Sequence, residues 1–258
     1  MNSSYLLNIV LNSMNLVLLP LLVSYPLAAI DTIPLNRTFN LIECYDGQLY
    51  LAPRIGQSIF SLVAPDSLDP ISFTDDISYR IRNFKMTPFA IYINRGKVIE
   101  KFFVASGNKE IIYTSGDISS FTMTPAEEVI LADRQTRELI FLDFTNQVKF
   151  KIENVNVEDV VWCDTMVYAL TTSAINQYDE HGNLIDARPI PEQCTRIFVA
   201  DRKIFVFTEQ SNYMYQLDID WRRIEFPLTI SDICATNKSY IVLNGTGNIL
   251  YIYSRDDF

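Results

Sequence analysis

The chain is poor in residues on which several classes of protein depend. It contains 8 glycines and 1 histidine among 258 residues. So few glycines argue against repeated close backbone cradles for phosphate groups. A single histidine excludes a histidine-based metal cluster, and a Ser-His-Asp triad would have to use His181. GxSxG, HExxH, P-loop and dinucleotide-binding motifs are also missing, so the sequence carries no common catalytic signature.

Positive charge is also in short supply. The 21 lysines and arginines are outnumbered by 31 acidic residues, which gives a formal net charge of −10. Nonspecific binding to nucleic acid or to anionic lipid requires a basic face, so we expect neither partner. Hydrophobic residues make up 48% of the chain, which is enough to bury a substantial core in one or two domains.

An apolar run lies near the N-terminus. Residues 16–23 read LVLLPLLV and are followed by SYPLAA, which ends in the small residues Ala28 and Ala29, as is typical of a signal peptide. We therefore predict a signal peptide over 1–29 and a periplasmic or extracellular protein. An uncleaved anchor and a cytoplasmic segment are the alternatives. Because a span needs roughly 20 apolar residues, we expect no stable membrane span after signal removal. The stretch is interrupted at Asn8, Asn12, Asn15 and Pro20.

A repeat fills the rest of the chain. The motifs FKMTP (84–88) and FTMTP (121–125) each lead into a short apolar run. Related runs occur at 49–52, 89–93, 128–132, 166–170, 204–207 and 240–243. Their starts recur at roughly 36 to 40 residues, which indicates six units of a structural repeat.

Each unit has the composition of strands and turns. Its runs are rich in Ile, Val, Tyr and Phe and are bounded by Asn, Asp, Gly, Pro or Ser. The second run of a unit is apolar throughout, which indicates a strand covered on both faces. The last run often alternates, as in QVKFKIE at 147–153. Four-stranded antiparallel sheets of this kind, arranged radially, form a β-propeller.

The two ends of the chain indicate how the ring closes. The sixth unit supplies three runs only, whereas the segment 31–35 precedes the first unit with nothing of its own to pair with. Unpaired strand edges are a liability that closure removes. We therefore predict that 30–258 is one all-β, six-bladed β-propeller, whose N-terminal strand completes the last blade.

One hairpin adds a family resemblance. The sequence YDEHGNLI at 178–185 has an aromatic residue, an aspartate, a two-residue tip and a glycine before an apolar strand. It resembles the outer turn of NHL-type and TolB-like six-bladed propellers. The resemblance implies the architecture over 31–258 but no activity, because such propellers host binding, scaffolding and hydrolysis. It also places His181 in a turn at the outer rim, away from any chemistry.

The 4 cysteines are not spaced as CxxC, so zinc binding and dithiol redox chemistry are not indicated. Buried free thiols, which behave as small hydrophobic residues, are the favoured interpretation. The alternative is a disulfide in an oxidising compartment. The repeat places Cys44 and Cys234 on the innermost strands of the first and last units, which are neighbours in a closed ring.

The best candidate for ligand binding is a set of basic turns. These turns join the second and third runs of units one to three, and such an arc could receive a carboxylate, a phosphate or an acidic peptide. Ordinary solubility is the favoured alternative for charged turns. The arc consists of Arg54, Arg95, Lys97, Arg134 and Arg137. Trp162, on an inner strand, could stack on a ligand, although core packing is favoured.

An enzymatic alternative rests on oxygen-bearing residues near the axis. Some six-bladed propeller hydrolases hold calcium on the axis, and oxygen ligands from several blades suit that ion. The candidate ligands are Glu43, Asn83, Asp159 and Asp232, for which solvated channel residues are the favoured interpretation. This alternative would make the protein a calcium-dependent esterase or lactonase-like hydrolase.

The sequence thus favours an exported binding or interaction module over an enzyme. We expect a monomer without a cofactor, which recognises a protein or a small anionic ligand at a channel mouth built from several blades. A structural subunit of a larger envelope assembly is a third possibility.

Overall fold

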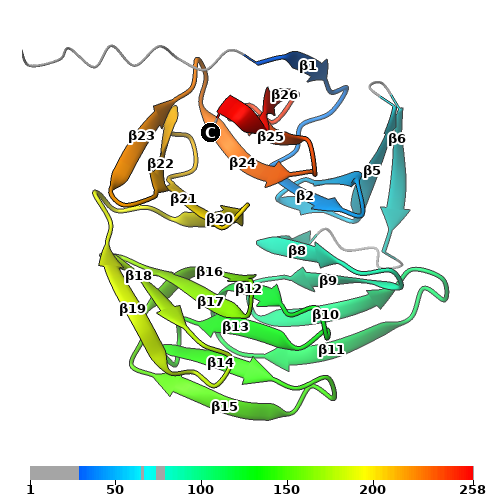
Figure 1. Ribbon diagram of the computed structural model, residues 1–258. Coiled ribbons are helices and arrows are strands. Elements are labelled where there is room, and N and C mark those ends of the chain that lie inside the picture. Colours follow the sequence, from blue (N-terminus) through cyan, green and yellow to red (C-terminus); the bar gives the residue numbers. More distant parts are fainter. Residues whose placement is uncertain (1–28, 65–66, 74–78, 258) are drawn as a thin grey trace, which may run out of the picture.

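A computed structural model describes residues 29–64, 67–73 and 79–257. The signal peptide predicted over 1–29 lies outside the described residues except for Ala29. The described chain forms six four-stranded antiparallel sheets arranged around a central axis (Figure 1). Helix is limited to one short 3-10 turn, η1 (Arg255–Asp257), in the described part. The predicted all-β, six-bladed propeller is confirmed.

Each blade runs outward from an innermost first strand. The first three blades are β2 (Leu41–Tyr45), β3 (Gln48–Ala52), β5 (Ser58–Ala64) and β6 (Ser67–Ser72); β8 (Asn83–Met86), β9 (Ala90–Asn94), β10 (Val98–Phe103) and β11 (Lys109–Thr114); and β12 (Ile118–Met123), β13 (Val129–Asp133), β14 (Glu138–Leu142) and β15 (Val148–Glu153). The fourth and fifth are β16 (Val157–Cys163), β17 (Met166–Thr171), β18 (Ala174–Tyr178) and β19 (Leu184–Pro189); and β20 (Arg196–Ala200), β21 (Lys203–Phe207), β22 (Tyr213–Leu217) and β23 (Trp221–Glu225).

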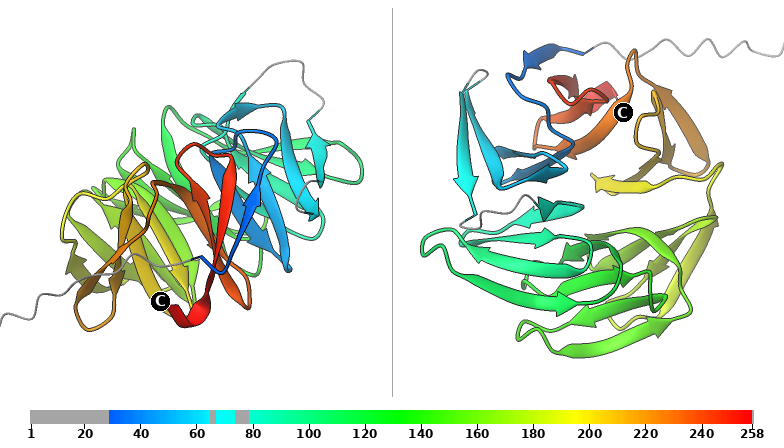
Figure 2. Two further views of the ribbon diagram at one scale, coloured as in Figure 1. Left: turned by 90° about the horizontal axis from the view of Figure 1, so that it is seen from above. Right: turned by 180° about the vertical axis from the view of Figure 1, so that it is seen from behind.

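The sixth blade closes the ring as the sequence predicts. It contains β24 (Ile230–Ala235), β25 (Ser239–Asn244), β26 (Ile249–Ser254) and, as its outer strand, β1 (Asp31–Pro34). β1 pairs with β26 in antiparallel register, from Asp31 opposite Ile252 to Pro34 opposite Ile249. The chain's first strand therefore lies beside its last one, as both views of Figure 2 show.

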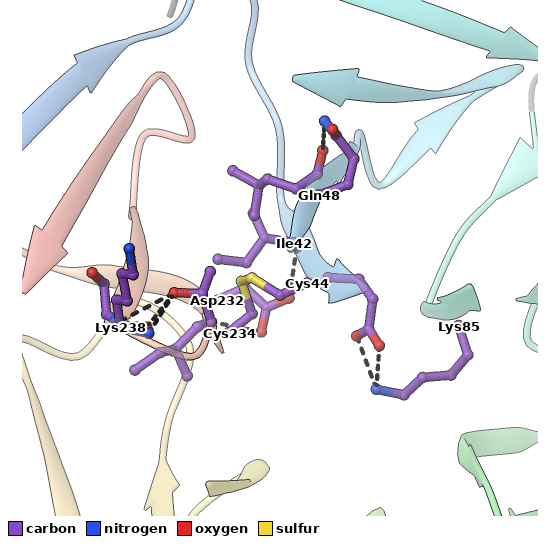
Figure 3. Close-up of a disulfide and its surroundings, with 12 residues drawn as sticks. Ile42, Cys44, Gln48, Lys85, Asp232, Cys234 and Lys238 are labelled. Carbon is purple, nitrogen blue, oxygen red and sulfur yellow. Dashed lines mark hydrogen bonds and ion pairs between the residues drawn. A yellow bond between two sulfur atoms is a disulfide. The ribbon is translucent and has the colours of Figure 1, made fainter. Parts of the chain in front are cut away.

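A disulfide makes a second closure, which links blade one to blade six. Cys44 on β2 is bonded to Cys234 on β24, with 5.8 Å between their Cα atoms (Figure 3). The favoured expectation of free thiols is therefore wrong for this pair. Cys163 and Cys194 are free, as expected. Burial raises the pKa of Cys194 to about 12, so its thiol is unreactive at neutral pH.

The hydrophobic core lies between blades rather than at the centre. Apolar clusters fill each interface between neighbouring sheets in the described chain, because the second strands are apolar on both faces. On β9, for example, Ile91 and Ile93 pack toward blade one, whereas Ala90 and Tyr92 pack toward blade three. The axis is thereby left to polar side chains.

The propeller has two ends. At the entry end the innermost strands begin, and the turns between second and third strands, such as the one containing Arg134, are found here. At the exit end the innermost strands finish, and two kinds of turn are found, one between first and second strands and one between third and fourth strands. No helix in the described residues is long and apolar enough to cross a membrane.

Candidate functional site

Polar links join the innermost strands around the axis. Asn83 donates to the Phe121 carbonyl over 2.8 Å, and Ser120 donates to Asp159. Asp159 accepts from the Ile197 backbone N–H over 3.0 Å. Arg196 is linked to Asp232 at 3.0 Å. The remaining links are Ile42 N–H to Asp232 at 3.0 Å and Lys85 with Glu43 at 2.9 Å (Figure 3). The channel is thus circled by hydrogen bonds between neighbouring blades.

Arg196 is the centre of this network. Its guanidinium lies 3.3 Å from Asp159, 3.0 Å from Asp232 and 3.4 Å from Glu209. The side chain is largely buried, with 19% exposed. These three carboxylates raise the pKa of Arg196 above its already high ordinary value, against the opposing effect of burial. The group is therefore a permanent cation inside the channel.

The Asp232 carboxylate is almost completely buried. Burial raises its pKa from 3.8 to about 6, although Arg196 and two backbone N–H donors act in the opposite direction. Those donors are Ile42 and Ile233, each at 3.0 Å. At neutral pH the carboxylate is mainly ionised and paired with Arg196.

This raised pKa predicts a pH-dependent stability. The folded protein binds the Asp232 proton more tightly than the unfolded chain does, so this contribution is fully present below pH 3.8 and is lost as pH rises through about 6. We expect the unfolding free energy of the wild type, relative to Asp232→Asn, to fall by up to about 3 kcal/mol between pH 4 and 7. Denaturant unfolding of both proteins across this range is the measurement. Parallel profiles would contradict the assignment.

A basic cavity of about 440 Å³ opens at the entry end of the channel. Its arginines outnumber its carboxylates by five to three. The arginines are Arg54, Arg80, Arg82, Arg134 and Arg196, and the acids are Glu158, Asp159 and Glu209. We call this cavity the arginine mouth. A second cavity of about 330 Å³ continues along the axis toward the exit end.

A small two-stranded sheet and an ordered turn position some of these arginines at the entry end. The small sheet of β4 (Ile55–Gly56) and β7 (Tyr79–Arg80) carries Arg80 beside Ile55, next to Arg54 in sequence. In the β13–β14 turn, the Asp133 carboxylate accepts from the Gln135 N–H over 3.0 Å and so orders the residues around Arg134.

Ion pairs hold the side chains of the arginine mouth in place. Arg54 of blade one pairs with Glu209 of blade five. Arg134 pairs with Glu158 at 2.5 Å, between blades three and four. Arg82 pairs with Asp117 at 2.6 Å, while its Nε is buried without an acceptor among the described residues. A bound anion would therefore meet guanidinium donors that these ion pairs already orient.

The predicted basic arc is only partly assembled at the arginine mouth. Arg54 and Arg134 line it. Arg95 is buried, pairs with Glu100 at 2.5 Å and lies 5.4 Å from the centre of the Phe73 ring. Lys97 and Arg137 are exposed but do not line the cavity. Of the predicted arc, only Arg54 and Arg134 therefore remain candidates for ligand binding at the arginine mouth.

The four candidate calcium ligands all line the axial cavity. Each already has a partner: Glu43 is paired with Lys85, Asn83 donates to Phe121, and Asp159 and Asp232 are paired with Arg196. No group of three or more His, Cys, Asp or Glu residues in the described chain is arranged to hold a metal. Calcium binding stays a prediction from the sequence.

Trp162 and His181 lie far from the arginine mouth. Trp162 is half-buried at the exit end, where it lines the axial cavity and packs against the apolar cluster between blades three and four. His181 is exposed in the β18–β19 turn, where its backbone N–H donates to Asp179 over 2.9 Å. Gly182 adopts a φ of 81° in this turn. The assignment of His181 as a turn residue is confirmed.

The sequence analysis did not identify Arg80, Arg82 and Arg196, because it considered basic residues only in the turns between second and third runs. Arg196 opens an innermost strand, at nearly the same position in its unit as Asp159 and Asp232. An arginine aligned with aspartates in a repeat is the signal that could have identified it.

Comparisons with known proteins support the fold. No protein-family profile matches the sequence, and no curated protein does. Among solved structures, a streptogramin B lyase is similar over 86% of each chain, with 11% identity and a TM-score of 0.63. A virginiamycin B lyase from Staphylococcus aureus is similar over 87% of each chain, with 11% identity and a TM-score of 0.61.

The WD40 β-propeller domain of Doa1 has 14% identity and a TM-score of 0.60, over 83% of this chain and 77% of that one. At such identities the likeness shows a propeller architecture alone. The class of this protein is therefore a six-bladed β-propeller. The finer likeness to NHL-type and TolB-like propellers stays a prediction.

Proposed function

We propose that this propeller is an exported binding module that recognises a carboxylate or phosphate group at the arginine mouth. The group is carried by a small ligand or is presented by a protein partner. The observation that carries the proposal is the excess of arginines in a cavity of about 440 Å³ on a protein whose net charge is −10. Such a local reversal of charge raises the concentration of anions at the mouth.

The chemistry of the arginine mouth favours recognition over catalysis. Guanidinium groups are planar, permanently charged and suited to two-point hydrogen bonding with carboxylates and phosphates. Arg54 and Arg134 each have 40% of the side chain exposed, so they can exchange a carboxylate partner for a ligand.

Calorimetric titration with citrate and with inorganic phosphate tests the proposal. We expect Arg134→Gln to weaken binding by about tenfold or more, because a charge-assisted hydrogen bond is worth roughly 1.5–3 kcal/mol. Glu158→Gln should strengthen binding, since it removes the carboxylate that competes for Arg134. Arg137→Gln is the matched control, because Arg137 is exposed on the same hairpin outside the cavity. Absent binding, or equal losses in both arginine variants, would refute the proposal.

A further inference from the structure

Strongly exposed large hydrophobic side chains gather at the exit end of the propeller. The innermost strands begin at the opposite end, so this surface is separate from the arginine mouth. Among the described residues, only Ile55 and Ile111 lie elsewhere. The others, with their exposed fractions, are Ile30 (64%), Val63 (61%), Phe89 (74%), Val104 (45%), Phe144 (76%), Val148 (46%), Leu184 (56%), Ile185 (56%) and Ile219 (88%).

These side chains recur at equivalent positions of successive blades. In blades one to five all except Phe89 lie in or beside the hairpin that joins the third strand to the fourth, for example Phe144 between β14 and β15 and Ile219 between β22 and β23. Phe89 lies in the neighbouring β8–β9 turn, where its carbonyl accepts from the Val104 N–H over 3.1 Å. Blade six has no such hairpin, but Ile30 takes the same position directly before its outer strand β1. Every blade thus contributes to this set, which we call the apolar rim. The outer strands that these hairpins lead into form the periphery of the propeller (Figure 1).

Such a set has no explanation in the packing of the chain. Exposed apolar residues scattered singly are normal, whereas a concentration at one end marks an interaction surface. Its members are contributed by all six blades, so an occupant that covers the whole rim contacts all blades at once. A broad, flat apolar phase meets this requirement.

The N-terminal segment identifies that phase. The N–H of Ile30 donates to the Ile252 carbonyl over 2.8 Å, which places the chain's entry into β1 at the exit end. The residues before it include LVLLPLLV, and none of residues 1–29 carries a charged side chain. Whether this segment is the predicted signal peptide or the alternative uncleaved anchor, it brings the exit end of the propeller, and with it the apolar rim, to a membrane surface.

We infer that the apolar rim docks the propeller on a zwitterionic lipid surface, with the exit end toward the lipid and the arginine mouth toward water. Side chains on six blades insert at the level of the headgroups, as apolar residues of peripheral proteins do. Carboxylates in the same hairpins, such as Asp143 and Asp179, suit the choline ammonium group rather than an anionic headgroup. The inference does not depend on the function proposed for the arginine mouth.

Co-sedimentation of the full chain with phosphatidylcholine vesicles tests the inference. Phe144→Ser/Ile219→Ser is expected to weaken binding by at least about tenfold, equivalent to about 1.4 kcal/mol, because burial of either side chain contributes more than this. Ile55→Ser/Ile111→Ser removes two equally exposed apolar residues outside the rim and should bind like the wild type. All three proteins share residues 1–29, so a difference among them reports on the rim and not on that segment.

A second readout locates the contact. The fluorescence of Phe144→Trp should shift to the blue on addition of the vesicles, whereas that of Ile55→Trp should not. Equal vesicle binding by the rim variant and the wild type would overturn the inference, as would no binding at all. Self-association of the wild type that Phe144→Ser/Ile219→Ser abolishes would also overturn it, because the rim would then be covered by a second copy of the chain.

Discussion

Replacing Arg196 by methionine is expected to lower the free energy of unfolding at pH 7 by roughly 3–5 kcal/mol. The substitution keeps much of the side-chain volume but removes the cation that faces Asp159, Asp232 and Glu209. Asp232 would then be a buried carboxylate with no ionic partner. Leaving such a charge unpaired costs more than the pair itself contributes. Denaturant unfolding at pH 7 is the measurement.

Two further variants test whether the loss in Arg196→Met arises from the unpaired Asp232 carboxylate. Asp232→Asn in the Arg196→Met background should recover part of the loss, because it removes the unpaired charge. Arg188→Met is the control: Arg188 pairs with Asp186 on the surface at 2.7 Å, and an exposed pair of this kind contributes roughly 0–1 kcal/mol. A loss in Arg196→Met no greater than that in Arg188→Met would show that the network does not stabilise the ring.

The architecture could be predicted because repetition constrains every unit at once. A single run such as 128–132 is compatible with a strand or a short helix, but six equivalent runs with similar neighbours are not. Closure followed from an unpaired strand at each end of the repeat, and β1 pairs with β26 accordingly. The scarcity of glycine was less informative, because some two-residue turns use other residues at positive φ. Asp164 and Thr165 adopt φ values of 48° and 69°, for example.

The site could not be predicted as fully, because it depends on how blades stack. Arg196 and Asp232 belong to different blades, and no local motif records that their side chains meet. Arg95 and Arg134 occupy equivalent turns, yet Arg95 folds back onto Glu100 whereas Arg134 reaches the arginine mouth. That difference arises from the surrounding side chains and not from the turn sequence. The apolar rim could not be predicted either, because it is defined by exposure in the folded chain, and valine or isoleucine in a strand-rich sequence is ordinarily buried.

Removal of the Cys44–Cys234 disulfide is expected to lower the unfolding free energy by roughly 2–5 kcal/mol. The bond links residues 190 positions apart, so it restricts most of the unfolded chain. The double variant Cys44→Ser/Cys234→Ser should still fold, because the pairing of β1 with β26 in blade six closes the same ring independently. Its denaturant midpoint should lie below that of the oxidised wild type and should coincide with that of the reduced wild type.

Cys163→Ser separates the disulfide from a general effect of cysteine replacement. Cys163 is a free thiol at the end of β16, so this variant should unfold like the wild type and should remain sensitive to reductant. Thiol titration of the unreduced, denatured wild type should find two free thiols, those of Cys163 and Cys194. Four free thiols, or a midpoint that reductant leaves unchanged, would mean that strand pairing alone closes the ring. A measurable shift would instead show that the ring is held at its inner strand by the disulfide and at its outer strand by β1.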